Sequence, residues 1–256
     1  MFSTGTVSIH GAYWRLQNKC GAVTNYLRVA TAGFPSAKTA IESESHYFVE
    51  DFLSNPKYSH LFVDVVALKA TGFETTVKEQ LTHKALFNAE QLVKATVLVF
   101  DHSALDAMLL DFCTATDDLA PEEWDTLIER KKVSYSEISS SEKPAIRKRL
   151  VDEILGQLSR ESILKKAERL HQICKPEAGG ANPDGFTFCV EELEEFDTLR
   201  HNIVHKASFD LTPTDIWKQH EYVSNVASYF YEILARRFDI RLDAATLQTI
   251  IASVSG

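Results

Sequence analysis

Apolar residues recur at steps of three and four positions along most of the chain, and this spacing predicts a mostly α-helical fold. The clearest stretch runs from about residue 75 to residue 114, where neither glycine nor proline interrupts the pattern. We expect one long helix here, or two helices with a bend near Asp101-His102-Ser103. The apolar stripe of this stretch includes Leu86, Ala89, Val93, Val97, Phe100, Ala104, Ala107 and Leu110.

Start and stop signals predict further helices in the second half of the chain. Pro121, with Glu122 and Glu123 beside it, opens a short helix through Ile128. Serine, glycine and proline residues mark loops over 134–141 and 175–185. The remaining helices are predicted over 144–174 (with a division near 156–162), 190–205, 213–238 and 244–254.

Residues 1–72 give a mixed signal. The segments 7–10 and 26–29 alternate like short strands, although neither is long enough to decide between strand and helix. Ser36 is expected to cap a helix over 37–53, which Asn55-Pro56 would end. We therefore predict three parts: an N-terminal extension (1–72) of α or mixed α/β structure, a helical domain (73–242), and a C-terminal short helix or tail (243–256).

Composition sets broad limits on the ligands of the protein. The 256 residues are 45% hydrophobic, which is ordinary for a globular protein and enough for a core. With 27 basic and 36 acidic side chains the net charge is −9, which argues against nonspecific coating of DNA. RNA stays open as a ligand, because a local cleft can be basic inside an acidic protein.

Cysteine usage and hydropathy indicate the compartment. Cys20, Cys113, Cys174 and Cys189 are scattered without a C-x-x-C pair, which predicts free thiols in a reducing environment. The N-terminus has no signal-peptide pattern, and no run approaches the ~18 apolar residues that a transmembrane helix needs. We expect a cytoplasmic location and no membrane association.

One predicted helix, 190–205, carries an unusual charge. On a wheel at ~100° per residue, Arg200 falls near the middle of its apolar side. A guanidinium there is costly unless it is paired or has a task. Pairing with Asp197, three residues back, is one explanation, and a functional role is the other. His205 lies ~140° around the helix from Arg200, so both reach one ligand only near a frayed helix end or with help from a second chain.

The run Thr198-Leu199-Arg200-His201-Asn202-Ile203-Val204-His205 resembles the signature of the HEPN superfamily (higher eukaryotes and prokaryotes nucleotide-binding). That signature is an arginine, a polar residue, a few variable positions and a histidine, here with the spacing R-x-x-x-x-H. The long earlier helix also resembles the first helix of the family, in which many members carry glutamate where this chain has Asp106. The resemblance covers about residues 75–240 and says nothing about the residues before them.

The resemblance implies a HEPN-like bundle of four or more helices, commonly a homodimer in which two copies of the motif face each other. Active members are metal-independent endoribonucleases of toxin–antitoxin, phage-defence and RNA-processing systems. The function to expect is therefore cleavage of single-stranded RNA, with an antitoxin or a defence-system protein as a further partner. The alternative is a catalytically inactive member that acts as a scaffold for nucleotides or for a protein partner.

RNA carries its own nucleophile, the 2′-hydroxyl, so the implied chemistry needs few protein groups and no cofactor. Carried over by position, His205 is the acid/base, and such proton transfer is worth ~10²–10⁴ in rate. Arg200 holds the phosphate and stabilises its growing negative charge. His201 and Asn202 orient the substrate or support His205.

Other kinds of site have weaker support in the sequence. His201 and His205 stand four apart and could share a metal, but zincins have glutamate where this chain has Asn202, so no metal is expected. P-loop and dinucleotide-binding glycine patterns are absent, as is a G-x-S-x-G elbow. Arg147-Lys148-Arg149 is the densest basic cluster and is the first choice for guiding RNA, although most such runs are solvated helix faces.

Overall fold

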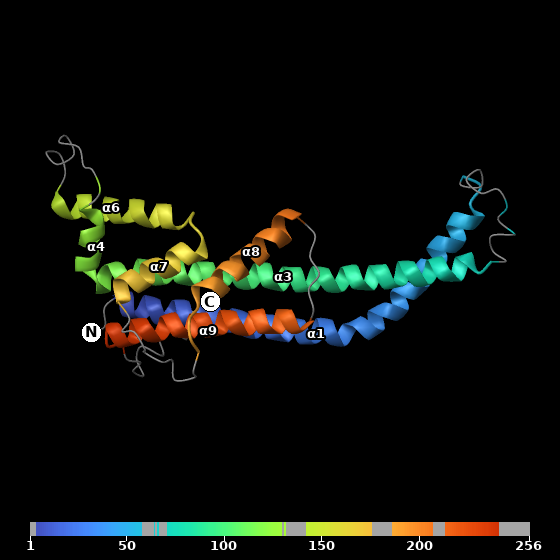
Figure 1. The fold of residues 1–256 in the computed structure, drawn as a ribbon, viewed down its shortest axis with the longest axis horizontal. Coiled ribbons are helices and arrows are strands. Elements are labelled where there is room, and N and C mark those ends of the chain that lie inside the picture. The colour runs from blue at the N-terminus through green and yellow to red at the C-terminus, as the bar shows by residue number, and fades with distance from the viewer. Residues whose placement is uncertain are drawn as a thin grey trace. The chain divides into compact units, whose positions relative to one another are not determined.

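The computed structural model describes residues 4–57, 64, 66, 71–129, 131, 142–175, 186–206 and 213–240, and these residues form helices and no strands. The predicted mostly helical fold is confirmed. Two of the helices are much longer than the rest, with 51 and 47 residues. The helices are α1 (Thr4–Ser54), α3 (Phe73–Leu119), α4 (Pro121–Ile128), α6 (Lys143–Leu158), α7 (Ile163–Cys174), α8 (Val190–Lys206) and α9 (Pro213–Arg237) (Figure 1).

The first 54 residues correct the sequence-based prediction. Helix α1 is continuous where two strand-like segments were considered, and it passes through Pro35 and the expected cap Ser36. Over residues 9–27 the reason is a buried stripe with steps of three and four residues, which a four-residue window does not detect; around Pro35 the side chains are exposed or half-buried and no such stripe is present. This stripe consists of Ile9, Ala12, Leu16, Cys20, Val23 and Leu27. The end of the helix at Ser54, just before Asn55-Pro56, agrees with the prediction.

The remaining helices follow the local signals. α3 is a single helix through Asp101-His102-Ser103, and α4 has Pro121 in its first turn, as predicted. The helix expected over 144–174 is divided into α6 and α7 between Leu158 and Ile163. The predicted loop 134–141, most of the loop 175–185 and the predicted terminal helix 244–254 lie outside the described residues.

The chain divides into two compact units, which we describe separately. Unit one contains the described residues up to Ala22, those from Leu98 to Lys206, and those from Thr214 onward. Unit two contains the described residues from Val23 to Val97, and Pro213. The predicted N-terminal extension, residues 1–72, therefore contributes to both units.

The frame of unit one is a set of three helices in which α1 runs antiparallel to both α3 and α9. On the α9 side, Tyr231 Oη lies 2.7 Å from His10 Nδ1, and the rings of Tyr231 and Tyr13 stack at 4.2 Å. On the α3 side, Arg15 forms an ion pair of 2.9 Å with Asp111. Figure 1 shows these helices side by side, with α7 and α8 laid across α3.

A separate part of the core closes the end of unit one where α4 meets α6. Trp124 of α4 is fully buried and donates its indole N–H to Thr116 Oγ1 of α3 at 3.1 Å. Burying the indole and satisfying its only donor stabilises this end of the unit. Trp124 packs in one cluster with Ala120, Val151, Ile154 and Ile173.

Unit two consists of the second part of α1 and the first part of α3. Val49 and Leu53 of α1 are buried, as are Ala95 and Val97 of α3. Both helices also carry many exposed charged side chains. Within the described ranges, no helix combines the length and the apolar character that crossing a membrane requires.

Gly5 provides a test of the α1–α3 contact in unit one. A Cβ atom at this position would lie 2.6 Å from Ala115 O and 2.9 Å from Leu119 Cγ, and the backbone oxygen cannot move away cheaply. We expect Gly5→Ala to lower the free energy of unfolding by about 1–3 kcal/mol, as overpacking does. Gly21 of the same helix has open space around it, so Gly21→Ala should raise stability by about 0.5–1 kcal/mol. Urea unfolding of both variants measures the contrast, and equal effects would contradict the close approach.

Candidate functional site

The predicted motif lies at the C-terminal end of α8. Arg200 and Asn202 are half-buried, whereas His201 and His205 are exposed. The rings of the two histidines lie 4.5 Å apart, because they are one helical turn from each other. Arg200 therefore points inward and His205 outward, as the helical wheel predicts.

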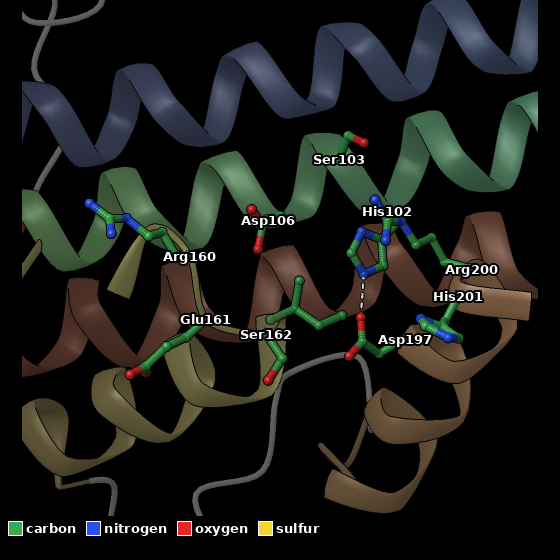
Figure 2. Close-up of a pocket in the computed structure, with 10 residues that line it drawn as sticks. His102, Ser103, Asp106, Arg160, Glu161, Ser162, Asp197, Arg200 and His201 are labelled. Atoms are coloured by element: carbon green, nitrogen blue, oxygen red, sulfur yellow. Dashed lines mark hydrogen bonds and ion pairs between the residues drawn. The ribbon is translucent and has the colours of Figure 1, made fainter. Parts of the chain in front are cut away.

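Arg200 and His201 line a pocket of about 390 Å³ in unit one. One wall is α3, the second is the connection from α6 into the start of α7, and the third is α8 (Figure 2). Most of the groups that line it are polar or charged, which suits a charged ligand better than an apolar one. The lining residues are His102, Ser103, Asp106, Arg160, Glu161, Ser162, Ile163, Asp197, Arg200 and His201.

His102 and Asp197 form a hydrogen-bonded pair across the pocket. The imidazole Nε2 lies 2.7 Å from Asp197 Oδ1, as Figure 2 shows, and the imidazole is only 10% exposed. Burial lowers the pKa of His102; Asp197 acts in the opposite direction, and the Arg200 charge lowers the pKa further. A histidine with a lowered pKa is neutral near pH 7 and can accept a proton.

The Arg200 guanidinium has an unpaired donor in the wall of the pocket. Its Nε is buried and has no hydrogen-bond partner among the described residues, and no ion pair of Arg200 occurs there either. Asp197, the partner considered from sequence, bonds to His102 instead. A buried donor without an acceptor is unfavourable, and an anionic ligand that binds the guanidinium would offset this cost with charge-assisted hydrogen bonds.

Two of the three carboxylates at the pocket already have a hydrogen-bond partner, and one of these two, Asp106, is paired with a cation. Asp197 bonds to His102, and Asp106 Oδ1 lies 2.5 Å from the ammonium of Lys166. Lys166 is 1% exposed and also donates to Glu161 O at 2.9 Å, so it fixes α7 to α3 behind the pocket. This buried pair serves the structure of the wall rather than the ligand.

The start of α7 adds positive potential to the same pocket. Ser162 is the N-cap of this 12-residue helix, and its side chain makes no capping hydrogen bond. Ser162 and Ile163 both line the pocket, so the positive end of the helix dipole lies at its wall. Arg160 also lines the pocket, although its guanidinium points away from Arg200 and His102 (Figure 2). The site is therefore suited to a phosphate group.

The other predicted site residues lie elsewhere. Asn202 and His205 do not line the pocket of the single chain. The basic cluster Arg147-Lys148-Arg149 lies on α6, away from the lining residues. Arg147 is engaged by Asp117 at 2.7 Å and by Asp125 at 2.8 Å, whereas Lys148 is exposed. A role of this cluster in RNA binding stays a prediction.

Sequence reasoning missed His102 and Lys166 as parts of the site. The sequence did contain a signal for His102. His102 and Asp106 stand one turn apart on the long helix and project to the same side of it (Figure 2). Their partners on α7 and α8 are 60 and 95 residues away in sequence, and no local pattern connects them.

The described residues of the pocket do not bring together three side chains in metal-binding geometry. Comparisons of the chain with protein-family models, with curated proteins and with solved structures found no match. The function is therefore inferred from the residues of the pocket and their geometry.

Proposed function

We propose that this protein is a metal-independent endoribonuclease that cleaves single-stranded RNA through attack by the RNA 2′-hydroxyl. The observation that supports this best is Arg200, a half-buried arginine without an ion-pair partner among the described residues, which lines a polar pocket. The α7 N-terminus and Arg160 favour the same ligand, a phosphodiester. A place in a toxin–antitoxin or phage-defence system, with a protein that restrains the nuclease, belongs to the same proposal.

The reaction assigns one task to each group. The 2′-hydroxyl loses its proton to an imidazole and attacks phosphorus, the bond to the 5′-oxygen breaks, and a second proton transfer converts that oxygen to a hydroxyl. Arg200 holds the phosphate and stabilises the charge that develops on it. His205 is the proton-transfer group of the motif, with support from His201 and Asn202. His102, oriented by Asp197, is the second imidazole at the phosphate.

The product ends test this mechanism directly. We expect cleavage of single-stranded RNA in a chelating buffer, with 2′,3′-cyclic phosphate and 5′-hydroxyl ends, because the nucleophile is the RNA's own hydroxyl. DNA of the same sequence lacks this hydroxyl and should stay intact. Mass spectrometry of the fragments identifies the ends. Products with 5′-phosphate ends, or equal cleavage of the DNA, would show that water is the nucleophile and that the proposal is wrong.

A second function, an inactive scaffold that binds nucleotides or a protein partner, is favoured by the position of His205. This residue is exposed and outside the pocket of its own chain. In a symmetric homodimer, His205 of one chain can complete the pocket of the other chain. His205 would then take part in catalysis although it lies outside the pocket of its own chain. The ribonuclease proposal therefore includes a homodimer built on the end of α8.

Mixing two inactive variants separates the two functions. Arg200→Ala and His205→Ala should each be inactive alone. If half of the randomly mixed dimers are heterodimers, and each has one intact site of two, about a quarter of the wild-type RNA cleavage should return. Light scattering of each variant confirms the dimer. If a verified mixed dimer does not recover RNA cleavage, the two chains do not share an active site. Nucleotide binding without any RNA cleavage would favour the scaffold function.

A further inference from the structure

A second polar cluster lies in the core of unit one, where α1, α3 and α9 pack together. Cys20 of α1, Asp101 of α3 and His220 of α9 each offer a ligand atom, and these atoms lie within 4.8 Å of one another. All three residues are buried. The proposed ribonuclease reaction uses none of them.

The cluster contains an unsatisfied acceptor. Asp101 is 1% exposed, and its Oδ2 lies 2.8 Å from His220 Nδ1. The other carboxylate oxygen, Oδ1, is buried and has no hydrogen-bond partner among the described residues. A buried carboxylate oxygen without a donor or a cation is unfavourable, so the geometry points to a ligand that it binds.

We propose that Cys20, Asp101 and His220 bind one divalent metal ion of the zinc type, which ties the three helices of unit one together. Thiolate, imidazole and carboxylate are the ligand set that zinc prefers in proteins. Two nitrogen or oxygen ligands of a tetrahedral zinc lie about 3.3 Å apart, so the 2.8 Å pair of Asp101 and His220 needs to open by only a small amount.

The charges of the cluster also match a divalent cation. A thiolate and a carboxylate carry two negative charges, and neutral histidine adds none, so a dication leaves the buried site neutral. The metal takes the place of the thiol proton, so binding should release a proton and weaken as the pH falls.

The burial of all three ligands indicates that the ion has a structural role and not a catalytic one. A catalytic zinc keeps a position that a substrate can reach, whereas the three ligands here are enclosed between helices, and the fourth position of a tetrahedral ion has no ligand from this cluster. The ion is therefore distinct from the pocket at Arg200, and the reaction proposed there does not depend on metal chemistry.

Cobalt(II) titration of the chelator-treated full-length protein tests the proposal. The wild type should bind one equivalent of Co²⁺, show a thiolate-to-cobalt charge-transfer band in the near ultraviolet, and gain thermal stability. Cys20→Ser should abolish the band and weaken binding by at least about 100-fold. Cys174→Ser is the matched control, because Cys174 is also a buried thiol of unit one but lies outside the cluster. It should behave as the wild type does.

X-ray absorption of the zinc-loaded wild type gives a reading that does not depend on any variant's folding. One sulfur and additional nitrogen and oxygen ligands are expected in the first coordination shell. Failure of the wild type to take up Co²⁺ or Zn²⁺ would overturn the proposal, as would a coordination shell without sulfur. A charge-transfer band that persists in Cys20→Ser would also overturn it.

Discussion

Arg200→Ala should lower the rate of RNA cleavage by about 10²–10³-fold, the loss typical of removing one donor to a developing oxyanion. The free energy of unfolding should change little, because the guanidinium has no hydrogen-bond or ion-pair partner among the described residues. Arg200→Lys keeps the charge but loses the two-pronged donor geometry, so it should restore only part of the rate. Single-turnover cleavage of a labelled RNA measures both variants.

Arg236→Ala is the matched control for this experiment. Arg236 belongs to the same unit, is exposed and pairs with Glu232 on its own helix, so its loss removes one positive charge away from the pocket. Cleavage by this variant should stay within a factor of about two, since an exposed pair contributes little. An Arg200→Ala protein that is folded and fully active would place the chemistry elsewhere.

Asp106→Ala should lower the free energy of unfolding by about 3 kcal/mol, because it leaves the buried ammonium of Lys166 without its counter-charge. The pair is 2.5 Å long and Lys166 is 1% exposed. Glu161 O still accepts a hydrogen bond from Lys166, so the loss lies at the lower end of the range for broken buried pairs. Chemical denaturation followed by circular dichroism measures the change.

A second aspartate of α3 provides the comparison. Asp111 pairs with Arg15 at 2.9 Å, but both side chains are nearly half exposed. Asp111→Ala removes the same chemical group from the same helix and should cost less than about 1 kcal/mol. Equal losses for the two variants would mean that the burial of Lys166 does not determine the strength of its pair.

Helix boundaries were predictable where a local residue determines them. Pro121 and Pro213 begin α4 and α9, and the division between α6 and α7 falls in the polar segment after Leu158. The continuity of α1 was not predictable in this way, because the helix contains Pro35 and several glycines, which disfavour helix. Packing of the buried stripe outweighs these local preferences over residues 9–27, whereas the largely exposed stretch around Pro35 has no explanation of this kind.

The candidate site was predictable only in part, for the same reason. Arg200 could be singled out from the sequence because the periodicity of its own helix places a charge on the apolar face. That pattern depends only on residues close to it in the chain. The pairing of His102 with Asp197 depends on how α3 packs against α8, across 95 residues of sequence. Asp197, the partner that the sequence offered to Arg200, bonds to His102, and the Nε of Arg200 has no partner among the described residues.

The antiparallel packing of α1 against α9 has a consequence for how the protein is made. His10 and Tyr231, which contact each other, are 221 residues apart. At a synthesis rate of 5–20 residues per second, roughly 11–44 s separate their appearance from the ribosome. During that interval His10 and Tyr13 of α1 have no α9 to pack against, and closing so long a loop is slow. Unit one therefore completes its folding late, after its last long helix has been synthesised.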